Sequence, residues 1–204
     1  MCANEKEILN EYEKYLKRLI ETESEELFSN GGLKHASILM SLLFDNTQNE
    51  VRLFCNGFKP DLITTEPYFS SLRKYLSDRK KSLSLLVEVT DYVDEDPFKL
   101  LINEKKNRGG VQDSGNIVYK QISEEAKNEM FKGRIPFNFA VFDDKMYRFE
   151  FDPKSYKAVG SFNSVEKCRG LIGLFDKAFE TAKEITPPFD GKGADNCSEQ
   201  SPFE

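Results

Sequence analysis

The residues from Phe137 to Asn163 constrain the fold more than any other part of the chain. Phe137, Phe139 and Val141 stand at every second position, and from 147 to 152 aromatic residues alternate with charged ones. This period of two sends successive side chains to opposite faces of a strand. Asp143, Asp144 and Lys145 between them have the composition of a tight turn. The segment predicts a β-hairpin, then a short strand at 156–160, a turn, and a long helix at about 164–184.

The preceding residues alternate between helical and strand patterns. Apolar residues at helical spacing predict helices at 4–28, 33–45, 67–79, 97–106 and 124–132. Strands are predicted at 50–56, 82–89 and 116–122, and the near-continuous apolar run at 82–89 is typical of a central buried strand. Residues 105–115 are polar and carry three glycines, which predicts a mobile loop. This order predicts an α/β fold with a mixed β-sheet flanked by helices.

Composition narrows the classes of ligand. A chain of 204 residues with 39% hydrophobic content is long enough for one domain with a substantial core. The net charge of -6 argues against a general nucleic-acid binder, because phosphate contacts need a surplus of Lys and Arg on one face. The basic runs Arg79–Lys81 and Lys105–Arg108 are interpreted as solvated charge. They are also the first places to look for a phosphate or nucleic-acid contact.

The cysteines and the N-terminal residues indicate a reducing compartment. The four cysteines include no CxxC pair, so we expect neither a disulfide framework nor a zinc site. The first residues are charged and lack the apolar core of a signal peptide. No apolar run approaches the roughly 20 residues of a membrane span. We therefore expect a cytoplasmic protein without membrane contact, metal or cofactor.

The domain organisation predicted from these patterns has three parts. An N-terminal helical extension covers residues 1–32, an α/β domain covers 33–185, and a disordered tail covers 186–204. The first helix carries an apolar stripe that must be buried. Its own domain, a second copy of the chain and a partner protein are the three alternatives.

The order of elements from about residue 33 to 184 resembles a single repeat of the phospholipase D family. The family's half-domain adds to its alternating strands and helices a hairpin with the motif HxKxxxxD, then a GSxN turn before a long helix. The resemblance implies a phospholipase D-like half-domain with an extra N-terminal helix. It also implies a homodimer, since single-repeat members pair so that two sites share one groove.

The catalytic motif of that family is only partly present. Its aspartate falls on Asp143, but the histidine position holds Pro136 and the lysine position holds Asn138, while Gly160–Asn163 matches GSxN. The family's mechanism needs one histidine to attack phosphorus, a second to protonate the leaving group, and lysine to hold the phosphoryl oxygens. The chain has one histidine, His35, which we interpret as a helix-start residue. A homodimer cannot supply a residue that each copy lacks.

Three functional hypotheses follow, of which the third, a groove that binds nucleic acid without chemistry, is opposed by the net charge of -6. The first is a catalytically inactive phospholipase D-like protein that serves as a binding, sensing or interaction module, with a link to bacterial defence or restriction implied by the resemblance alone. Its predicted ligand groove is lined by Asn138, Asp143, Arg148, Glu150, Ser161 and Asn163. The alternative is a metal-dependent nuclease or phosphodiesterase with a carboxylate cluster of Glu88, Asp91, Asp143 and Glu150.

Each groove residue also has a structural interpretation. Asp143 could serve the turn alone, and Ser161 and Asn163 could hold their turn and cap the last helix. Arg148 and Glu150 share one strand face, either as a solvated pair worth under about 1 kcal/mol or as part of the groove. The expected partners are a second copy, a protein bound through the N-terminal helix, and the unidentified ligand of the groove.

Overall fold

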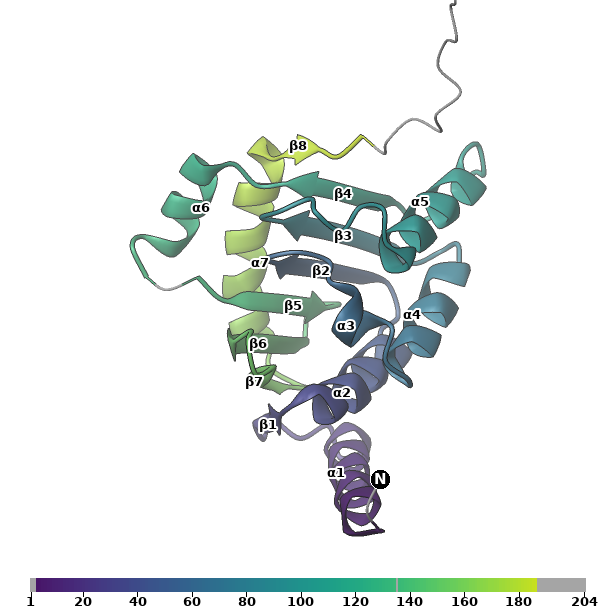
Figure 1. The fold of residues 1–204 in the computed structure, drawn as a ribbon, viewed down its shortest axis with the longest axis vertical. Helices are drawn as coiled ribbons and strands as arrows, with labels where there is room; N and C mark the ends of the chain where they lie inside the picture. The colour runs from purple at the N-terminus through teal and green to yellow at the C-terminus, as the bar shows by residue number, and fades with distance from the viewer. Residues whose placement is uncertain (1–2, 135, 187–204) are drawn as a thin grey trace, which may run out of the picture.

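The computed structural model describes residues 3–134 and 136–186, which form one eight-stranded sheet with helices on both faces (Figure 1). The helices are α1 Ala3–Glu21, α2 Leu33–Asn46, α3 Pro60–Ile63, α4 Tyr68–Ser77, α5 Asp96–Arg108, α6 Glu124–Phe131 and α7 Val165–Thr181. The strands are β1 Phe28–Gly31, β2 Glu50–Cys55, β3 Ser82–Val87, β4 Ile117–Gln121, β5 Asn138–Phe142, β6 Met146–Asp152, β7 Lys157–Ser161 and β8 Lys183–Glu184. The predicted tail lies outside the described residues from 187 onward.

The sheet mixes parallel and antiparallel pairs, as predicted. Its strand order is β1-β7-β6-β5-β2-β3-β4-β8. β2, β3 and β4 are parallel neighbours, whereas β5, β6 and β7 form an antiparallel meander that joins the parallel part through β2. The carboxyl ends of β2 and β3 therefore lie at the same edge of the sheet as the start of β5.

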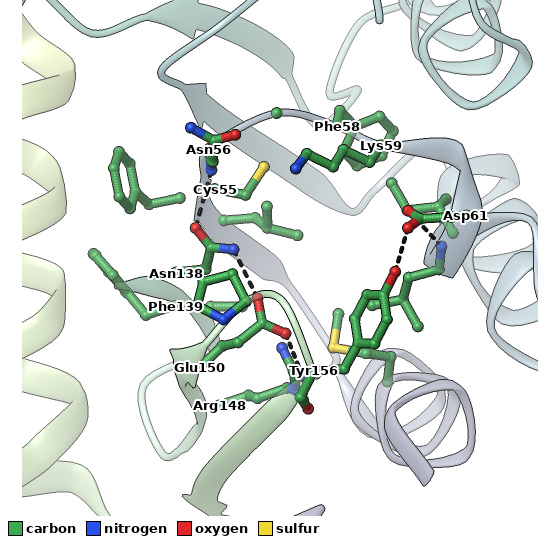
Figure 2. Close-up of a pocket in the computed structure, with 18 of the residues that line it drawn as sticks. Cys55, Asn56, Phe58, Lys59, Asp61, Asn138, Phe139, Arg148, Glu150 and Tyr156 are labelled. Atoms are coloured by element: carbon green, nitrogen blue, oxygen red, sulfur yellow. Dashed lines mark hydrogen bonds and ion pairs between the residues drawn. The ribbon is translucent and has the colours of Figure 1, made fainter. Parts of the chain in front are cut away.

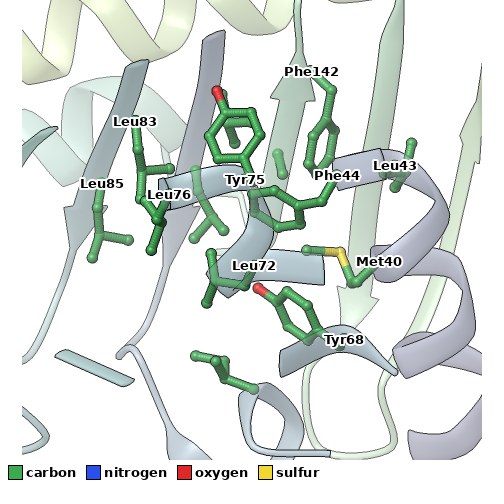
Figure 3. Close-up of a cluster of buried hydrophobic side chains, with 14 of the residues drawn as sticks. Met40, Leu43, Phe44, Tyr68, Leu72, Tyr75, Leu76, Leu83, Leu85 and Phe142 are labelled. Atoms are coloured by element: carbon green, nitrogen blue, oxygen red, sulfur yellow. The ribbon is translucent and has the colours of Figure 1, made fainter. Parts of the chain in front are cut away.

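Two hydrophobic cores lie on the two faces of the sheet. In β2, Leu53 belongs to the core beneath α1, α2, α4 and α5, whereas its neighbour Phe54 belongs to the core beneath α6 and α7. This division follows from the period-two alternation of a strand. In the first core, Phe44 of α2 packs against Tyr68, Tyr75 and Phe142, and the side chains from α2, α4 and the sheet interlock (Figure 3).

The first helix is part of the domain core. Leu16 and Leu19 are fully buried and belong to the same cluster as the residues of α2 and α4. The later part of its apolar stripe is thus buried within the protein's own domain, whereas Ile8 near its start is 48% exposed. The helix ends at Glu21 and not at residue 28, because Glu23 adopts a left-handed conformation and Phe28 starts the edge strand β1. No helix among residues 3–134 and 136–186 is long and apolar enough to cross a bilayer.

The predicted loop at 105–115 begins later than expected because α5 continues to Arg108. This arginine is buried, and its guanidinium donates hydrogen bonds to the carbonyl oxygens of Leu76, Asp78, Lys81 and Gly115. The solvated interpretation is therefore wrong for Arg108, which joins the end of α4 to the loop before β4.

Gly160 of β7 is required by close packing. A Cβ atom at this position would overlap the carbonyl oxygen of Tyr147 and the ring of Phe28. Phe28 is buried and packs against Phe162 with ring centroids 4.9 Å apart. The glycine of the Gly-Ser-x-Asn sequence thus has a packing role in this chain.

We predict that Gly160→Ala destabilises the protein by about 1–3 kcal/mol, because the added methyl group overpacks the contact between β1 and β7. Chemical denaturation measures the change. The matched control is Gly173→Ala on α7, where a Cβ meets nothing within 4 Å and alanine should stabilise the helix by about 0.5–1 kcal/mol. A Gly160→Ala protein as stable as the wild type would contradict the packing role.

Candidate functional site

A pocket opens at the carboxyl end of β2, where the start of β5 and the loop between β6 and β7 meet the segment that leads to α3 (Figure 2). Ligand sites of open α/β sheets occur at the carboxyl ends of strands. The cavity has a volume of about 90 Å³. Its apolar walls include Met40, Leu53, Phe58, Leu62, Ile63, Tyr68, Phe139 and Ala140. Its polar walls include Asn56, Lys59, Asp61, Asn138, Arg148, Glu150 and Tyr156.

Arg148 and Glu150 form a buried ion pair on one side of this pocket. Arg148 Nη2 lies 2.8 Å from Glu150 Oε1, and the two side chains are only 7% and 6% exposed. The two residues are separated by one position of β6, so both side chains leave the same face of the strand. A β-bulge follows Glu150 and separates Asp152 from this face. The solvated interpretation of this pair is therefore wrong.

Asn138 connects the ion pair to the end of β2. Its Nδ2 donates a hydrogen bond of 2.7 Å to Glu150 Oε2, and its Oδ1 accepts one of 2.9 Å from the backbone N–H of Asn56. The residue at the lysine position of the resembled motif is thus engaged in fixing Glu150 and the first residue after β2.

Tyr156 and Asp61 form the opposite side of the pocket. The Tyr156 hydroxyl donates to Asp61 Oδ2, and its backbone oxygen accepts from Arg148 Nη2 at 3.2 Å and from Asn30 Nδ2. Burial, followed by the hydrogen bond to Asp61, raises the pKa of Tyr156 to about 12. Its φ of 58° is left-handed, which aims the ring across the loop toward α3. The loop is thus tied to Arg148 through its backbone and to α3 through its side chain.

The pocket contains no activated nucleophile among the described residues. The one histidine, His35, lies on α2 with its ring 4.7 Å from that of Tyr12 and is absent from the pocket lining. Cys55 does line the pocket, but burial raises the pKa of its thiol and keeps it protonated. Pro136, at the histidine position of the motif, is exposed.

The structure separates the six predicted groove residues into two groups. Asn138, Arg148 and Glu150 line the pocket, whereas Asp143, Ser161 and Asn163 lie at the other end of the meander. Ser161 pairs with Tyr147, which pairs with Val141 near the end of β5. The separation follows from the topology, because β7 is the second strand after β5 in an antiparallel meander and so runs in the same direction as β5. The end of β7 therefore lies at the opposite end of the strands from Asn138, which begins β5.

The second group has structural contacts. Asp143 accepts hydrogen bonds from the backbone N–H groups of Gln48, Asn49 and Glu50 at 2.8–3.1 Å and so anchors the start of β2. Ser161 Oγ accepts from the Asn163 N–H, and Asn163 Nδ2 donates to the carbonyl oxygen of Glu23. The cap position of α7 is occupied by Ser164, whose side chain makes no capping hydrogen bond.

The predicted carboxylate cluster does not assemble. Glu150 is engaged with Arg148 and Asn138, Glu88 contacts Asn56 and Lys127, and Asp143 lies at the other edge of the sheet. In the part of the chain that the structure describes, no group of three or more His, Cys, Asp or Glu side chains could hold a metal ion. The metal-dependent alternative thus lacks its ligand set.

Several pocket residues were not predicted from the sequence. Lys59, Asp61 and Tyr68 come from the segment after β2, and Tyr156 comes from the β6–β7 loop. The position of residues 56–61 directly after a predicted strand was a usable signal, because strand ends form the crevice in this class of sheet. No local sequence pattern indicated that Tyr156 and Asp61 would meet across the pocket.

Comparison with solved structures identifies the fold. No family model and no curated protein matches the chain. The archaeal chromatin protein TrmBL2, described as showing a novel mode of DNA binding, superposes with a TM-score of 0.56 at 16% identity over 89% of this chain and 63% of that one. Nuc from Salmonella typhimurium, a phospholipase D family member, superposes with a TM-score of 0.52 at 13% identity over 78% of this chain and 99% of that one. The chain has a phospholipase D-like α/β fold, and it spans about 63% of the chromatin protein's length.

We predict that Asp143→Asn destabilises the protein by about 1–3 kcal/mol, because an amide cannot accept all three backbone hydrogen bonds. Asparagine tolerates the left-handed φ of 52° at this position, so the turn itself is retained. Chemical denaturation measures the change, with the exposed Asp144→Asn as the control expected to fall within about 0.5 kcal/mol of wild type. Equal stability of the two variants would contradict the anchoring role.

We predict a strong energetic coupling between Arg148 and Glu150. Arg148→Met and Glu150→Gln should each cost about 3–5 kcal/mol, because each leaves the other charge buried without its partner. The double variant should lose less than the sum of the single changes, with a coupling of at least about 2 kcal/mol in a double-mutant cycle. Additive losses would mean that the two charges do not depend on each other.

Proposed function

We propose that this protein is a non-catalytic, phospholipase D-like binding module that holds a small ligand in the pocket between β2, β5 and the β6–β7 loop. The observation that carries the proposal is the Asn138–Glu150–Arg148 network, which occupies the floor of the crevice with groups suited to recognition. A few fixed polar groups in a mostly apolar concavity are the usual composition of a small-molecule site.

The chemistry of the pocket argues against phosphoryl transfer. Covalent transfer needs a nucleophile activated by a base or by a lowered pKa. The thiol and phenol groups of the described pocket belong to Cys55, Tyr68 and Tyr156, and burial raises the pKa of all three. Glu150 could act as a base only by giving up its bonds to Arg148 and Asn138. Binding without chemistry needs none of these changes.

Two further features bear on the partners. The described lining of the pocket belongs to one chain, and the homodimer stays a prediction. The net charge of -6 argues against proposing for this chain the DNA binding that is described for the chromatin protein.

The proposal predicts no phosphodiesterase activity. The purified protein should not hydrolyse bis-p-nitrophenyl phosphate, single- or double-stranded DNA, or phosphatidylcholine vesicles above the buffer rate. The assays include EDTA, Mg²⁺ and Mn²⁺, with an active phosphodiesterase as the positive control. Hydrolysis that scales with protein concentration and disappears in Glu150→Gln would overturn the proposal.

The binding function is tested separately with a fragment library and ¹H–¹⁵N NMR. Fragments that bind should shift the backbone resonances of Asn56, Lys59 and Asn138, which lie around the pocket. The resonances of Gln48 and Asn49 at the opposite end of β2 serve as the internal control. A library in which no compound shifts the pocket resonances would contradict a small-molecule site.

A further inference from the structure

We propose that the ligand of this pocket carries a carboxylate on a short apolar body. This inference rests on the proposed binding function and identifies the chemical class that the pocket recognises. The shared chemistry has two sources, a free carboxylic acid and the C-terminal carboxylate of a polypeptide.

The first observation is an unused donor on a buried arginine. Arg148 uses Nε to bond Asn30 and Nη2 to bond Glu150 and Tyr156. Its Nη1 has no hydrogen-bond partner in residues 3–134 and 136–186, although the side chain is only 7% exposed and lines the pocket. This nitrogen is not fully buried, so an oxygen acceptor supplied by a ligand in the pocket can bind it.

A second unused donor comes from Tyr68. This residue is 1% exposed and lines the pocket, yet its hydroxyl makes no hydrogen bond to the described part of the chain. Burial raises the pKa of this hydroxyl, so it remains protonated and able to donate. The hydroxyl oxygen itself is not fully buried, so a ligand in the pocket can accept its hydrogen bond.

Lys59 supplies a further positive charge. Figure 2 shows its ammonium group directed into the pocket beside Cys55, and it forms no ion pair within the described residues. The pocket's acidic groups, in contrast, are engaged. Glu150 binds Arg148 and Asn138, and Asp61 binds the Tyr156 hydroxyl and the N–H of Leu62. Within the described lining, the free groups include the donors of Arg148, Tyr68 and Lys59 and the neutral acceptor Asn56 Oδ1. The only charged groups among them are the cationic Arg148 and Lys59, which favours a ligand with a negative charge.

The lining disfavours an anion with two negative charges. Lys59 and Arg148 are balanced by Asp61 and Glu150 in the same lining. A phosphate dianion would bring two negative charges beside these two carboxylates, whereas a carboxylate brings one, which Arg148 Nη1 and Lys59 can bind.

The size of the pocket limits what is enclosed. A volume of about 90 Å³ is smaller than the roughly 150 Å³ of an engineered apolar cavity that binds benzene. This space accepts a carboxylate and about two or three carbons against Met40, Leu53 and Ala140. A longer body has to extend out of the pocket, which is how a polypeptide C-terminus would enter.

The test is a titration followed by ¹H–¹⁵N NMR, with butyrate and an N-acetylated peptide ending in valine as probes of the two sources. Butyramide and the C-terminally amidated peptide are the neutral controls, and methyl phosphate is the competing anion. We expect at least one carboxylate probe to shift the pocket resonances with an affinity at least about tenfold above its amide control. The arm that binds identifies the source.

Variants separate recognition from folding. Tyr68→Phe removes a hydroxyl that has no partner, so it should weaken carboxylate binding about fivefold to tenfold while the melting temperature stays unchanged. Lys59→Gln should have a similar effect, and Lys154→Gln, an exposed lysine outside the lining, should have none. Unchanged affinity in both pocket variants would overturn the assignment.

The remaining outcomes distinguish the carboxylate class of the ligand from the proposed binding function itself. Equal binding of the acids and amides, or tighter binding of methyl phosphate, would overturn the assignment of a carboxylate but leave the proposed ligand site. Fragments that map to the pocket while every carboxylate fails would do the same. Failure of every compound would overturn the binding function as well.

Discussion

The crevice of this protein depends on the buried ion pair between Arg148 and Glu150. Two charges so fully removed from water are tolerated only when both have good partners. Here those partners are Asn138 on β5, Asn30 on β1 and the backbone oxygen of Tyr156. The pair therefore joins β6 to β5, to β1 and to the β6–β7 loop, at the end of the strands where the pocket opens.

The same network supports the proposal that this phospholipase D-like fold binds a ligand without phosphoryl transfer. A catalytic site needs side chains whose reactive atoms are free to meet the substrate. In this chain Glu150 and Asn138 are hydrogen-bonded to each other, and burial keeps the Cys55 thiol protonated. Among the described residues, the groups that remain free include one guanidinium nitrogen of Arg148, the hydroxyl of Tyr68 and the ammonium group of Lys59, which are suited to holding a ligand in place.

Much of the fold could be predicted from the sequence because periodicity is a local signal. The buried strand at 82–89 and the hairpin around Asp143–Lys145 were predicted within a few residues of their observed bounds. The edge strands β1 and β8 were not predicted, because four and two residues carry too little pattern and exist only through their pairing with β7 and β4.

The site was predictable only in part, for a reason of topology. Arg148 and Glu150 were correctly grouped because their spacing of two places them on one strand face. Asp143, Ser161 and Asn163 were grouped with them through a sequence motif, but the meander of β5, β6 and β7 carries those residues to the opposite edge. Asp61 and Tyr156 meet across the pocket from distant segments, a contact that no local pattern encodes.

The most direct test of this account is a crystal structure of the protein grown with butyrate. The account predicts a carboxylate within hydrogen-bond distance of Arg148 Nη1, with the Arg148–Glu150 pair and the Asn138 bonds intact. A pocket that stays empty both with butyrate and with the valine-terminated peptide, or a carboxylate that displaces Glu150 from Arg148, would contradict the claim that this crevice is organised for binding.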